Sequence, residues 1–599
     1  MITPDLYDFD LETQKNINLW LNGHYDDETK ATIKSMLKDN PKQVLDAFFT
    51  HLAFGTAGLR GIMGIGTNRM NVYTVRAATQ GLANYMLKQP KEQTNLAIFI
   101  GYDSRHQSRL FAEETAKVMA GNGIRAYLCK NIRPTPYVSF GVRLQHCLSG
   151  VMITASHNPA EYNGYKVYWS DGGQIVPLHD TGIIAEVVKI IDPTLVKTVS
   201  SISHPLIEEV EDKVDEAYIQ AVNSIQNYPQ INLEKGHLLK IVYTSLHGTG
   251  ITLIPEVFSG WGFNNLSFVD QQIIPDGSFP TVKSPNPEEH AALKLGIEKM
   301  LNTTSDLLIA TDPDADRVGI AVYHHGETIL MNGNQIAAIC LEHICEALSQ
   351  QRRLPPQAAF IKSIVTTELF QAICDSYQRP CFNVLTGFKY IAEKIREWET
   401  LPDGYQFIFG AEESYGYLPG TYARDKDAVS TSALICEIAL QAKLQGKTLI
   451  DRLHDLYQKY GIYFEGVLPV VFEDTKKGKE QIVRCMDYLR KNPLNIIQQI
   501  PVTAIDDYAI STKLDLKSGK TSPIPLPASD IIVYWFEDKT KIIIRPSGTE
   551  PKIKIYCSLI ERTFATISEG LENCNMRCNG LLKLLKELLT SNQTPQDGI

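Results

Sequence analysis

The sequence lacks the features that would place the protein in a membrane or outside the cell. No window approaches the ~20 uninterrupted apolar residues that span a bilayer as a helix. The N-terminus begins Met1-Ile2-Thr3-Pro4-Asp5, which is acidic where an export signal would be basic and then apolar. We therefore expect neither export nor a membrane anchor, and we expect a cytoplasmic location.

Organised cysteine and clustered positive charge are also missing. The 11 cysteines are scattered, and Cys574 and Cys578, one helical turn apart, have no second cysteine or histidine pair at zinc spacing. Reduced thiols in a cytosol are the simplest interpretation. The formal net charge of -10, without a run rich in Lys and Arg, argues against a nucleic-acid partner. An anionic ligand would have to be held by local loops.

The length of the chain and its linker signals indicate several domains. The 599 residues exceed what one core supports, since domains average about 150 residues. Short β-rich apolar runs alternate with amphipathic stretches from Phe54 onward, which predicts an α/β fold. Linker signals at 191–204, 324–327 and 460–473 separate the regions. We expect a helical N-terminal extension over 1–50 and four domains over 51–200, 205–325, 326–460 and 465–599.

Four short apolar strands run directly into compact polar loops. In open α/β sheets, ligands bind beyond the carboxyl ends of the strands. Four such strand ends, one in each expected domain, could therefore face one cleft. The strands and their loops are 151–153 into 154–159, 307–309 into 311–316, 407–409 into 412–414, and 542–544 into 545–549.

The second of these loops is a candidate metal site. Asp312, Asp314 and Asp316 alternate, so an extended loop can turn all three carboxylates to one side and offer only oxygen ligands, which suits Mg²⁺. A calcium EF-hand is a poor match, because its sixth position would be Arg317 rather than glycine and its twelfth Tyr323 rather than glutamate. A solvated acidic turn is the alternative without function.

The first loop carries a candidate nucleophile, Ser156, before an Asn-Pro turn. The chain lacks the Gly-x-Ser-x-Gly elbow of α/β-hydrolases at this serine, so an acyl-enzyme mechanism is unsupported. His157 and Lys166 are the nearby groups that could move protons, and an electropositive site would lower the pKa of Lys166. Each of the three residues taken alone is more simply a turn or surface residue.

The remaining loops suggest anion and hydroxyl recognition. Arg545, two hydroxyls and a glycine can cradle a phosphate, although Ser-Gly-Thr is also ordinary turn chemistry. Glu412 and Ser414 offer the acceptor and donor needed to hold vicinal sugar hydroxyls, and a surface acidic patch would look the same. The Gly-rich stretch 55–61 carries Arg60.

Together and in this order, the loops resemble the α-D-phosphohexomutase superfamily, which includes the phosphoglucomutases and phosphomannomutases. The resemblance rests on Thr-Ala-Ser-His-Asn-Pro, Asp-x-Asp-x-Asp-Arg, Glu-x-Ser and Arg-Pro-Ser-Gly-Thr-Glu-Pro, spread from residue 154 to 551. It implies three similar mixed α/β sheet domains and a smaller C-terminal α+β domain around a central cleft. Supporting matches are 55–61, 163–166, 247–250 and 386–389.

The resemblance also implies roles for individual residues. Ser156 would be the phosphorylated nucleophile and would share one Mg²⁺ per subunit with the three aspartates of the metal loop, Asp312, Asp314 and Asp316. The other catalytic candidates would be His157, Lys166 and Arg60. Candidates for substrate binding are Arg317, Lys389, Glu412, Ser414, Arg424, Arg545, Ser547, Gly548 and Thr549.

The expected activity is that of a phosphoglucomutase. It would interconvert glucose 1-phosphate and glucose 6-phosphate, with glucose 1,6-bisphosphate as intermediate and activator, in a monomer or weak dimer. Phosphomannomutase or phosphopentomutase activity on the same scaffold is the alternative. This chain departs from many relatives in having Pro313 between the first two aspartates, which stiffens the loop without removing a ligand.

Two other classes of protein compete with the mutase. Asp314-Ala315-Asp316-Arg317-Val318 after an apolar strand also fits a haloacid-dehalogenase-type phosphatase, in which the first aspartate would be the nucleophile and Ser156 incidental. A non-catalytic phosphosugar-binding scaffold would show damage to one loop, and all four motifs are intact.

Overall fold

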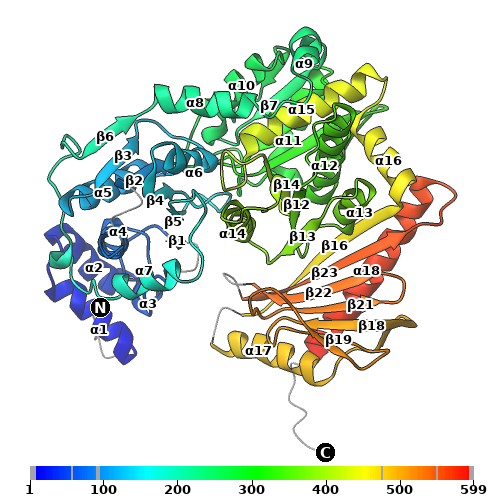
Figure 1. Cartoon of the computed structure of the whole chain (residues 1–599). Helices are drawn as coiled ribbons and strands as arrows, with labels where there is room; N and C mark the ends of the chain where they lie inside the picture. Colours follow the sequence, from blue (N-terminus) through cyan, green and yellow to red (C-terminus); the bar gives the residue numbers. More distant parts are fainter. Residues whose placement is uncertain (1–8, 55–57, 90–94, 474–475, 548–550, 592–599) are drawn as a thin grey trace, which may run out of the picture. The chain divides into compact units, whose positions relative to one another are not determined.

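The computed structural model describes residues 9–54, 58–89, 95–473, 476–547 and 551–591 (Figure 1). The chain forms two compact units, of which the first comprises 1–333, 346–359 and 387–448 and the second comprises 334–345, 360–386 and 449–599. Within the described ranges, the helices are too short or too polar to cross a membrane.

The chain begins with three helices around a small apolar core of their own. Asp10 caps the first helix, because its carboxylate accepts hydrogen bonds from the backbone N–H groups of Glu12 and Thr13. The core includes Trp20 and Phe48, both almost inaccessible to solvent. The helices are α1 (Leu11–Asn22), α2 (Asp27–Asp39) and α3 (Pro41–Phe48).

A six-stranded mixed sheet follows, in the order β1-β5-β4-β2-β3-β6. Strand β4 (Cys147–Ile153) is buried along its whole length, and it ends directly before the serine loop. Strand β5 (Tyr162–Trp169) returns antiparallel to it. The other strands and helices are β1 (Gly58–Ile62), α4 (Val72–Leu87), β2 (Asn95–Tyr102), α5 (Ser108–Gly121), β3 (Arg125–Cys129), α6 (Thr135–Leu144), α7 (His179–Val187), η2 (Pro193–Leu195) and β6 (Ile207–Val210).

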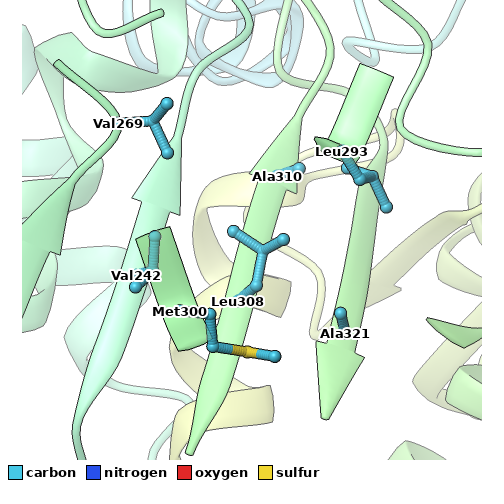
Figure 2. Close-up of a cluster of buried hydrophobic side chains, with 7 residues drawn as sticks. All are labelled: Val242, Val269, Leu293, Met300, Leu308, Ala310 and Ala321. Carbon is cyan, nitrogen blue, oxygen red and sulfur yellow. The ribbon is translucent and has the colours of Figure 1, made fainter. Parts of the chain in front are cut away.

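The second sheet has five strands in the order β11-β10-β9-β7-β8. Leu308 and Ala310, two positions apart on β9 (Leu307–Thr311), point to the same face and pack with Leu293 and Met300 of α11 (His290–Asn302), as Figure 2 shows. This packing fixes the strand from which the three aspartates extend. The other elements are α8 (Asp212–Asn223), α9 (Pro229–Lys235), η3 (Gly236–Leu238), β7 (Ile241–Thr244), η4 (Thr249–Thr252), α10 (Ile254–Gly260), β8 (Leu266–Phe268), β10 (Val318–His324) and β11 (Glu327–Met331).

The next region contains two strand pairs. β12 (Ala358–Ser363) and β13 (Cys381–Val384) are parallel, whereas β14 (Gln406–Glu412) and β15 (Gly416–Pro419) are antiparallel. Glu412 therefore ends a strand, and Ser414 lies in the turn that follows it. The helices are α12 (Gly333–Gln350), α13 (Glu368–Ser376), α14 (Phe388–Glu399), α15 (Ala428–Leu444) and α16 (Leu449–Tyr460).

The C-terminal region is an antiparallel sheet with two helices, in the order β16-β23-β22-β21-β18-β19-β20, with β17 paired to β18. Two expected linkers have regular structure: 324–327 is the turn of the β10–β11 hairpin, and 460–473 contains β16 (Ile462–Val471). The other elements are α17 (Lys476–Lys491), β17 (Ile496–Ile497), β18 (Ile500–Asp507), β19 (Thr512–Asp515), β20 (Thr521–Pro523), β21 (Ile532–Phe536), β22 (Lys541–Pro546), β23 (Lys552–Glu561) and α18 (Ile567–Ser591).

Candidate active site

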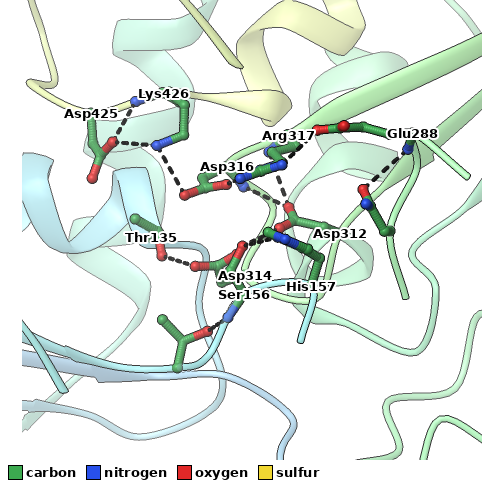
Figure 3. Close-up of polar contacts among 12 residues, drawn as sticks. Thr135, Ser156, His157, Glu288, Asp312, Asp314, Asp316, Arg317, Asp425 and Lys426 are labelled. Atoms are coloured by element: carbon green, nitrogen blue, oxygen red, sulfur yellow. Dashed lines mark hydrogen bonds and ion pairs between the residues drawn. The ribbon is translucent and has the colours of Figure 1, made fainter. Parts of the chain in front are cut away.

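Ser156 lies in a strained turn directly after β4, and its hydroxyl faces the metal loop. Its φ of 52° is in the left-handed region that serine seldom adopts. The Thr154 side chain accepts a hydrogen bond from the Ser156 N–H at 2.8 Å, which holds the turn. The Ser156 hydroxyl donates to Oδ2 of Asp312 at 2.6 Å and lies 3.2 Å from Nδ1 of His157 (Figure 3). Strain that persists in a buried turn is typical of functional sites.

Arg105, which is not among the predicted site residues, holds the backbone of the serine loop. Its guanidinium donates to the carbonyl oxygens of Ser156 at 2.6 Å and Pro159 at 2.7 Å, and also to that of Asn158. The side chain is fully buried and paired with Asp103 at 3.3 Å. The sequence signal was present, because Asp-Ser-Arg follows the carboxyl end of β2 as the other site loops follow their strands.

The three aspartates of the metal loop are buried and gathered together. One carboxylate oxygen of each aspartate lies within 4.8 Å of the corresponding oxygens of the other two. Oδ1 of Asp312 accepts the backbone N–H groups of Asp316 at 3.1 Å and Arg317 at 3.0 Å, which closes the loop. The Thr135 hydroxyl donates to Oδ2 of Asp314 at 2.7 Å. Nothing in the sequence around Thr135 identified it as a member of this site.

These carboxylates fit a divalent cation. Oδ1 of Asp314 and Oδ1 of Asp316 are buried and accept no hydrogen bond from any residue that the structure describes. Burial raises the pKa of Asp312 well above its usual value, and the neighbouring charges of Asp314 and Asp316 raise it further. Buried acceptors without a donor and surplus negative charge are the conditions that a hard cation relieves.

The loop 247–250 supports the metal loop through backbone contacts. The Thr249 N–H donates to the Pro313 carbonyl at 2.7 Å. A Cβ atom on Gly248 would lie 2.3 Å from Cα of Pro313, so only glycine permits this approach. Pro313, which many relatives lack, is thus packed directly against the loop 247–250.

Lys166 contacts two of the three aspartates. Its ammonium is 2.7 Å from Oδ2 of Asp314 and 3.2 Å from Oδ2 of Asp316. Burial lowers the pKa of Lys166, but the two carboxylates outweigh burial and the net shift is upward. The sequence-based expectation of a lowered pKa is wrong, because the carboxylates of Asp314 and Asp316 outweigh both burial and the positive charge of Lys426.

His157 is uncharged at neutral pH, so its ring can accept a proton. Burial lowers its pKa well below the usual histidine value, and the positive charges of Arg317 and Arg60 add to the effect. Arg60 donates to the Asn158 side chain at 3.2 Å, and Arg317 is paired with Glu288 at 2.6 Å. All three predicted residues therefore lie around the serine and metal loops.

The predicted sugar-binding residues adjoin one another. The Glu412 carboxylate accepts the backbone N–H of Gly387 at 2.7 Å, two residues before Lys389 in the first turn of α14. Burial raises the pKa of Glu412 and lowers that of Lys389. Ser414 is half-buried in the turn after β14.

Arg424 and its neighbour Lys426 have different surroundings. The Arg424 guanidinium is fully buried, donates to the carbonyl oxygens of Thr421 and Ala423, and pairs with Glu399. Its predicted role in substrate binding stays a prediction. Lys426 belongs to the stretch 424–428, which the resemblance also assigns to recognition of substrate phosphate or hydroxyls, and its ammonium contacts the metal loop, 3.2 Å from Oδ2 of Asp316.

The predicted phosphate loop belongs to the second unit. Arg545 ends β22 with its guanidinium 5.9 Å from the ring of Tyr556, and the Ser547 N–H donates to the Lys552 carbonyl at 2.8 Å. Gly548 and Thr549 lie outside the described residues. The phosphate-binding role of the loop stays a prediction.

Comparison with known proteins identifies the family. Three models of the phosphoglucomutase/phosphomannomutase family match this chain: α/β/α domain I over residues 51–193, domain II over 216–326 and domain III over 332–460. The chain belongs to this family. The resemblance seen in the sequence motifs is thereby confirmed, and so is the fold class of three α/β domains followed by a separate C-terminal domain.

Relatives in the phosphoglucomutase/phosphomannomutase family cover nearly the whole chain. A phosphoglucomutase of Staphylococcus aureus strain MSSA476 is 39% identical over 531 residues, which is 88% of this chain and 93% of the relative. One of Staphylococcus haemolyticus strain JCSC1435 is 38% identical over 533 residues, with the same coverage. The protein is accordingly an intramolecular phosphotransferase, a phosphosugar mutase.

Solved structures of the family share the fold. The pp63/parafusin phosphoglucomutase of Paramecium, in its open form, has a TM-score of 0.64 at 16% identity, covering 90% of this chain and 96% of that one. A phosphoglucomutase/phosphomannomutase family protein of Burkholderia thailandensis has a TM-score of 0.63 at 16% identity, with coverages of 89% and 96%. Family membership favours the mutase over the phosphatase alternative.

Proposed function

We propose that the protein interconverts glucose 1-phosphate and glucose 6-phosphate through a phosphoserine at Ser156, with glucose 1,6-bisphosphate as the intermediate. The observation that carries the proposal is the 2.6 Å contact between the Ser156 hydroxyl and the Asp312 carboxylate, which joins the nucleophile to the buried aspartate cluster. The choice of glucose is supported by the staphylococcal phosphoglucomutases.

Two phosphoryl transfers account for the reaction. In the first, the bond between phosphorus and the Ser156 oxygen breaks, phosphorus bonds to the free hydroxyl oxygen of the sugar monophosphate, that hydroxyl releases its proton, and the Ser156 oxygen takes one up. In the second, the Ser156 oxygen bonds to the other phosphorus of the reoriented bisphosphate and releases its proton, and the sugar oxygen that leaves takes one up. Neutral His157, 3.2 Å from the Ser156 hydroxyl, is suited to accept the proton and give it back.

The other residues bind and orient. Asp312, Asp314 and Asp316 would hold Mg²⁺, which supplies charge stabilisation to the phosphoryl group when it is bound. Lys166, with its raised pKa, stays protonated and offers positive charge at the same place. Glu412, Ser414 and Lys389 would hold sugar hydroxyls or phosphate, and Arg545, Ser547, Gly548 and Thr549 the phosphate that does not react.

A coupled assay tests the proposal. Purified protein with glucose 1-phosphate, Mg²⁺ and a trace of glucose 1,6-bisphosphate should form glucose 6-phosphate, and Ser156→Ala should lose nearly all of that activity. Mannose 1-phosphate and ribose 1-phosphate in the same assay should turn over more slowly. Wild-type protein without turnover above a heat-killed control would overturn the proposal, and faster turnover of either competing sugar would overturn the choice of glucose. A cytoplasmic location and a monomer or weak dimer stay predictions.

A further inference from the structure

Lys426 places a buried positive charge against the metal loop from a different loop, at the start of α15. Its ammonium lies 3.2 Å from Oδ2 of Asp316 and 3.1 Å from Oδ1 of Asp425, and the residue is 8% exposed (Figure 3). The residue directly precedes Asp427, which caps the buried helix α15 by accepting the N–H groups of Val429 and Ser430. The ammonium therefore bridges two loops at a fixed point of the fold.

The surroundings of Lys426 hold the ammonium in place. Oδ2 of Asp425 accepts hydrogen bonds from the Tyr168 hydroxyl at 2.8 Å and the Gln174 amide at 2.7 Å, so this carboxylate is anchored to the first sheet and its following loop. A Cβ on Gly416 would lie 2.0 Å from Cδ of Lys426, so the lysine stem packs directly against the Gly416 backbone. The ring of Phe388 lies 5.5 Å from the ammonium.

The two carboxylate oxygens of Asp316 have different neighbours, because Lys426 and Lys166 both contact the same one. Both ammonium groups lie 3.2 Å from Oδ2, whereas Oδ1 accepts no hydrogen bond from any described residue and has the Arg317 guanidinium at 3.9 Å. An oxygen already neutralised by two lysines is a poor ligand for a cation, and the other oxygen is left for that purpose. The positive charges of the two lysines also repel a divalent cation bound by the aspartates, and this repulsion is strong because the distance is short and the surroundings have low polarity.

We propose that Lys426 is a positioning residue that fixes the orientation of Asp316 and, through its charge, weakens the hold of the three aspartates on a divalent cation. The proposal rests on the assignment of the aspartates under the proposed function. It assigns opposite effects to one side chain, because the ammonium helps orient the site for turnover and opposes tight binding of the ion. Replacing a residue needed only for folding would not lower turnover while strengthening binding of the ion.

Replacing Lys426 by an uncharged side chain of similar length separates its effect on turnover from its effect on ion binding. Lys426→Met in the full chain should bind Mn²⁺ about tenfold more tightly by calorimetry, because a nearby like charge is gone. Its kcat at saturating Mn²⁺ should fall about tenfold or more, because Asp316 is no longer held. Lys443→Met is the matched control, since Lys443 pairs with Asp306 at 2.6 Å and touches no aspartate of the triad. Neither quantity should change in the control.

A second variant keeps the charge and removes its anchor. Asp425→Asn leaves the Lys426 ammonium in place but weakens its tether, so kcat should fall while Mn²⁺ affinity does not rise. This variant decides the matter if Lys426→Met does not fold, as judged by thermal unfolding.

Unchanged or weaker Mn²⁺ binding in Lys426→Met would overturn the proposal, and so would an unchanged kcat. Tighter Mn²⁺ binding in Asp425→Asn would overturn it as well. Failure of the proposed function is a different result, because wild-type protein would then turn over no sugar phosphate although the calorimetric comparison could still be made.

Discussion

Two buried clusters of lysine and carboxylate, one in each unit, differ in how their charges balance. In the metal-loop cluster, Lys166 and Lys426 face three aspartates, and two carboxylate oxygens accept no hydrogen bond from a described residue. In the second cluster, Lys362 and Lys541 share Glu368, at 3.1 and 2.6 Å.

The lysines of the second cluster are also satisfied by the backbone. Lys362 donates to the Thr366 carbonyl at 3.1 Å, and Lys541 donates to the Ile364 carbonyl at 2.7 Å. Burial alone therefore does not mark a cation site. Three carboxylates gathered around one point do, whereas the two lysines of the second cluster share the carboxylate of Glu368, so the second cluster is a structural bridge between α13 and β22.

The largest expected effect is the loss of a metal ligand. Asp314→Asn should lower kcat about 1,000-fold, equivalent to about 4 kcal/mol of transition-state stabilisation. Steady-state kinetics across a Mg²⁺ titration measure it, and chelation of wild-type protein by EDTA, reversed by added Mg²⁺, is the parallel test. Full activity of Asp314→Asn at ordinary Mg²⁺ would place the cation elsewhere.

Loss of the carboxylate that the two lysines of the second cluster share should lower stability rather than activity. Glu368→Gln leaves two buried lysines without their shared carboxylate, so the free energy of unfolding should fall by about 3 kcal/mol. Denaturant titration measures that fall, and kcat per folded molecule should stay unchanged. A loss of kcat without a loss of stability would contradict the contrast between the clusters.

A smaller, pH-dependent effect is expected at Glu465, beside the second cluster. Burial, and then the charge of Glu368, raise its pKa from 4.5 to about 7. A carboxyl group with a higher pKa in the folded state destabilises the fold as pH rises from 4.5, and the loss is complete above 7. Glu465→Gln should therefore add about 1–3 kcal/mol of stability above pH 7. No gain below pH 4.5 is expected, and thermal unfolding at both extremes would show it.

The smallest effect concerns the loop that holds the triad. Pro313→Gly should lower the free energy of unfolding by about 0.5 kcal/mol, because the unfolded chain gains freedom. Mn²⁺ affinity and kcat should change less than about twofold, since no ligand is lost. A much larger loss of Mn²⁺ affinity would show that proline rigidity itself holds the aspartates.

Much of the site could be predicted because its motifs are local. A serine or an aspartate run directly after a buried strand is visible in a few consecutive residues, and the structure brings Ser156 and Asp312 within 2.6 Å. For Arg105 the strand-end signal gives the position but not the partner, because Ser156 is 51 residues away and the contact is made to a backbone carbonyl. Side-chain patterns carry no information about which distant carbonyl a guanidinium meets.

The sequence by itself determined the strands, the loops at their ends and the kind of chemistry each loop offers, because side-chain periodicity and turn preference act over a few residues. Only the tertiary structure decided which charges meet. Lys166 shows the difference, since its raised pKa depends on facing Asp314 and Asp316. Electrostatic shifts depend on distance and burial, and both arise when strands and loops remote in sequence pack together.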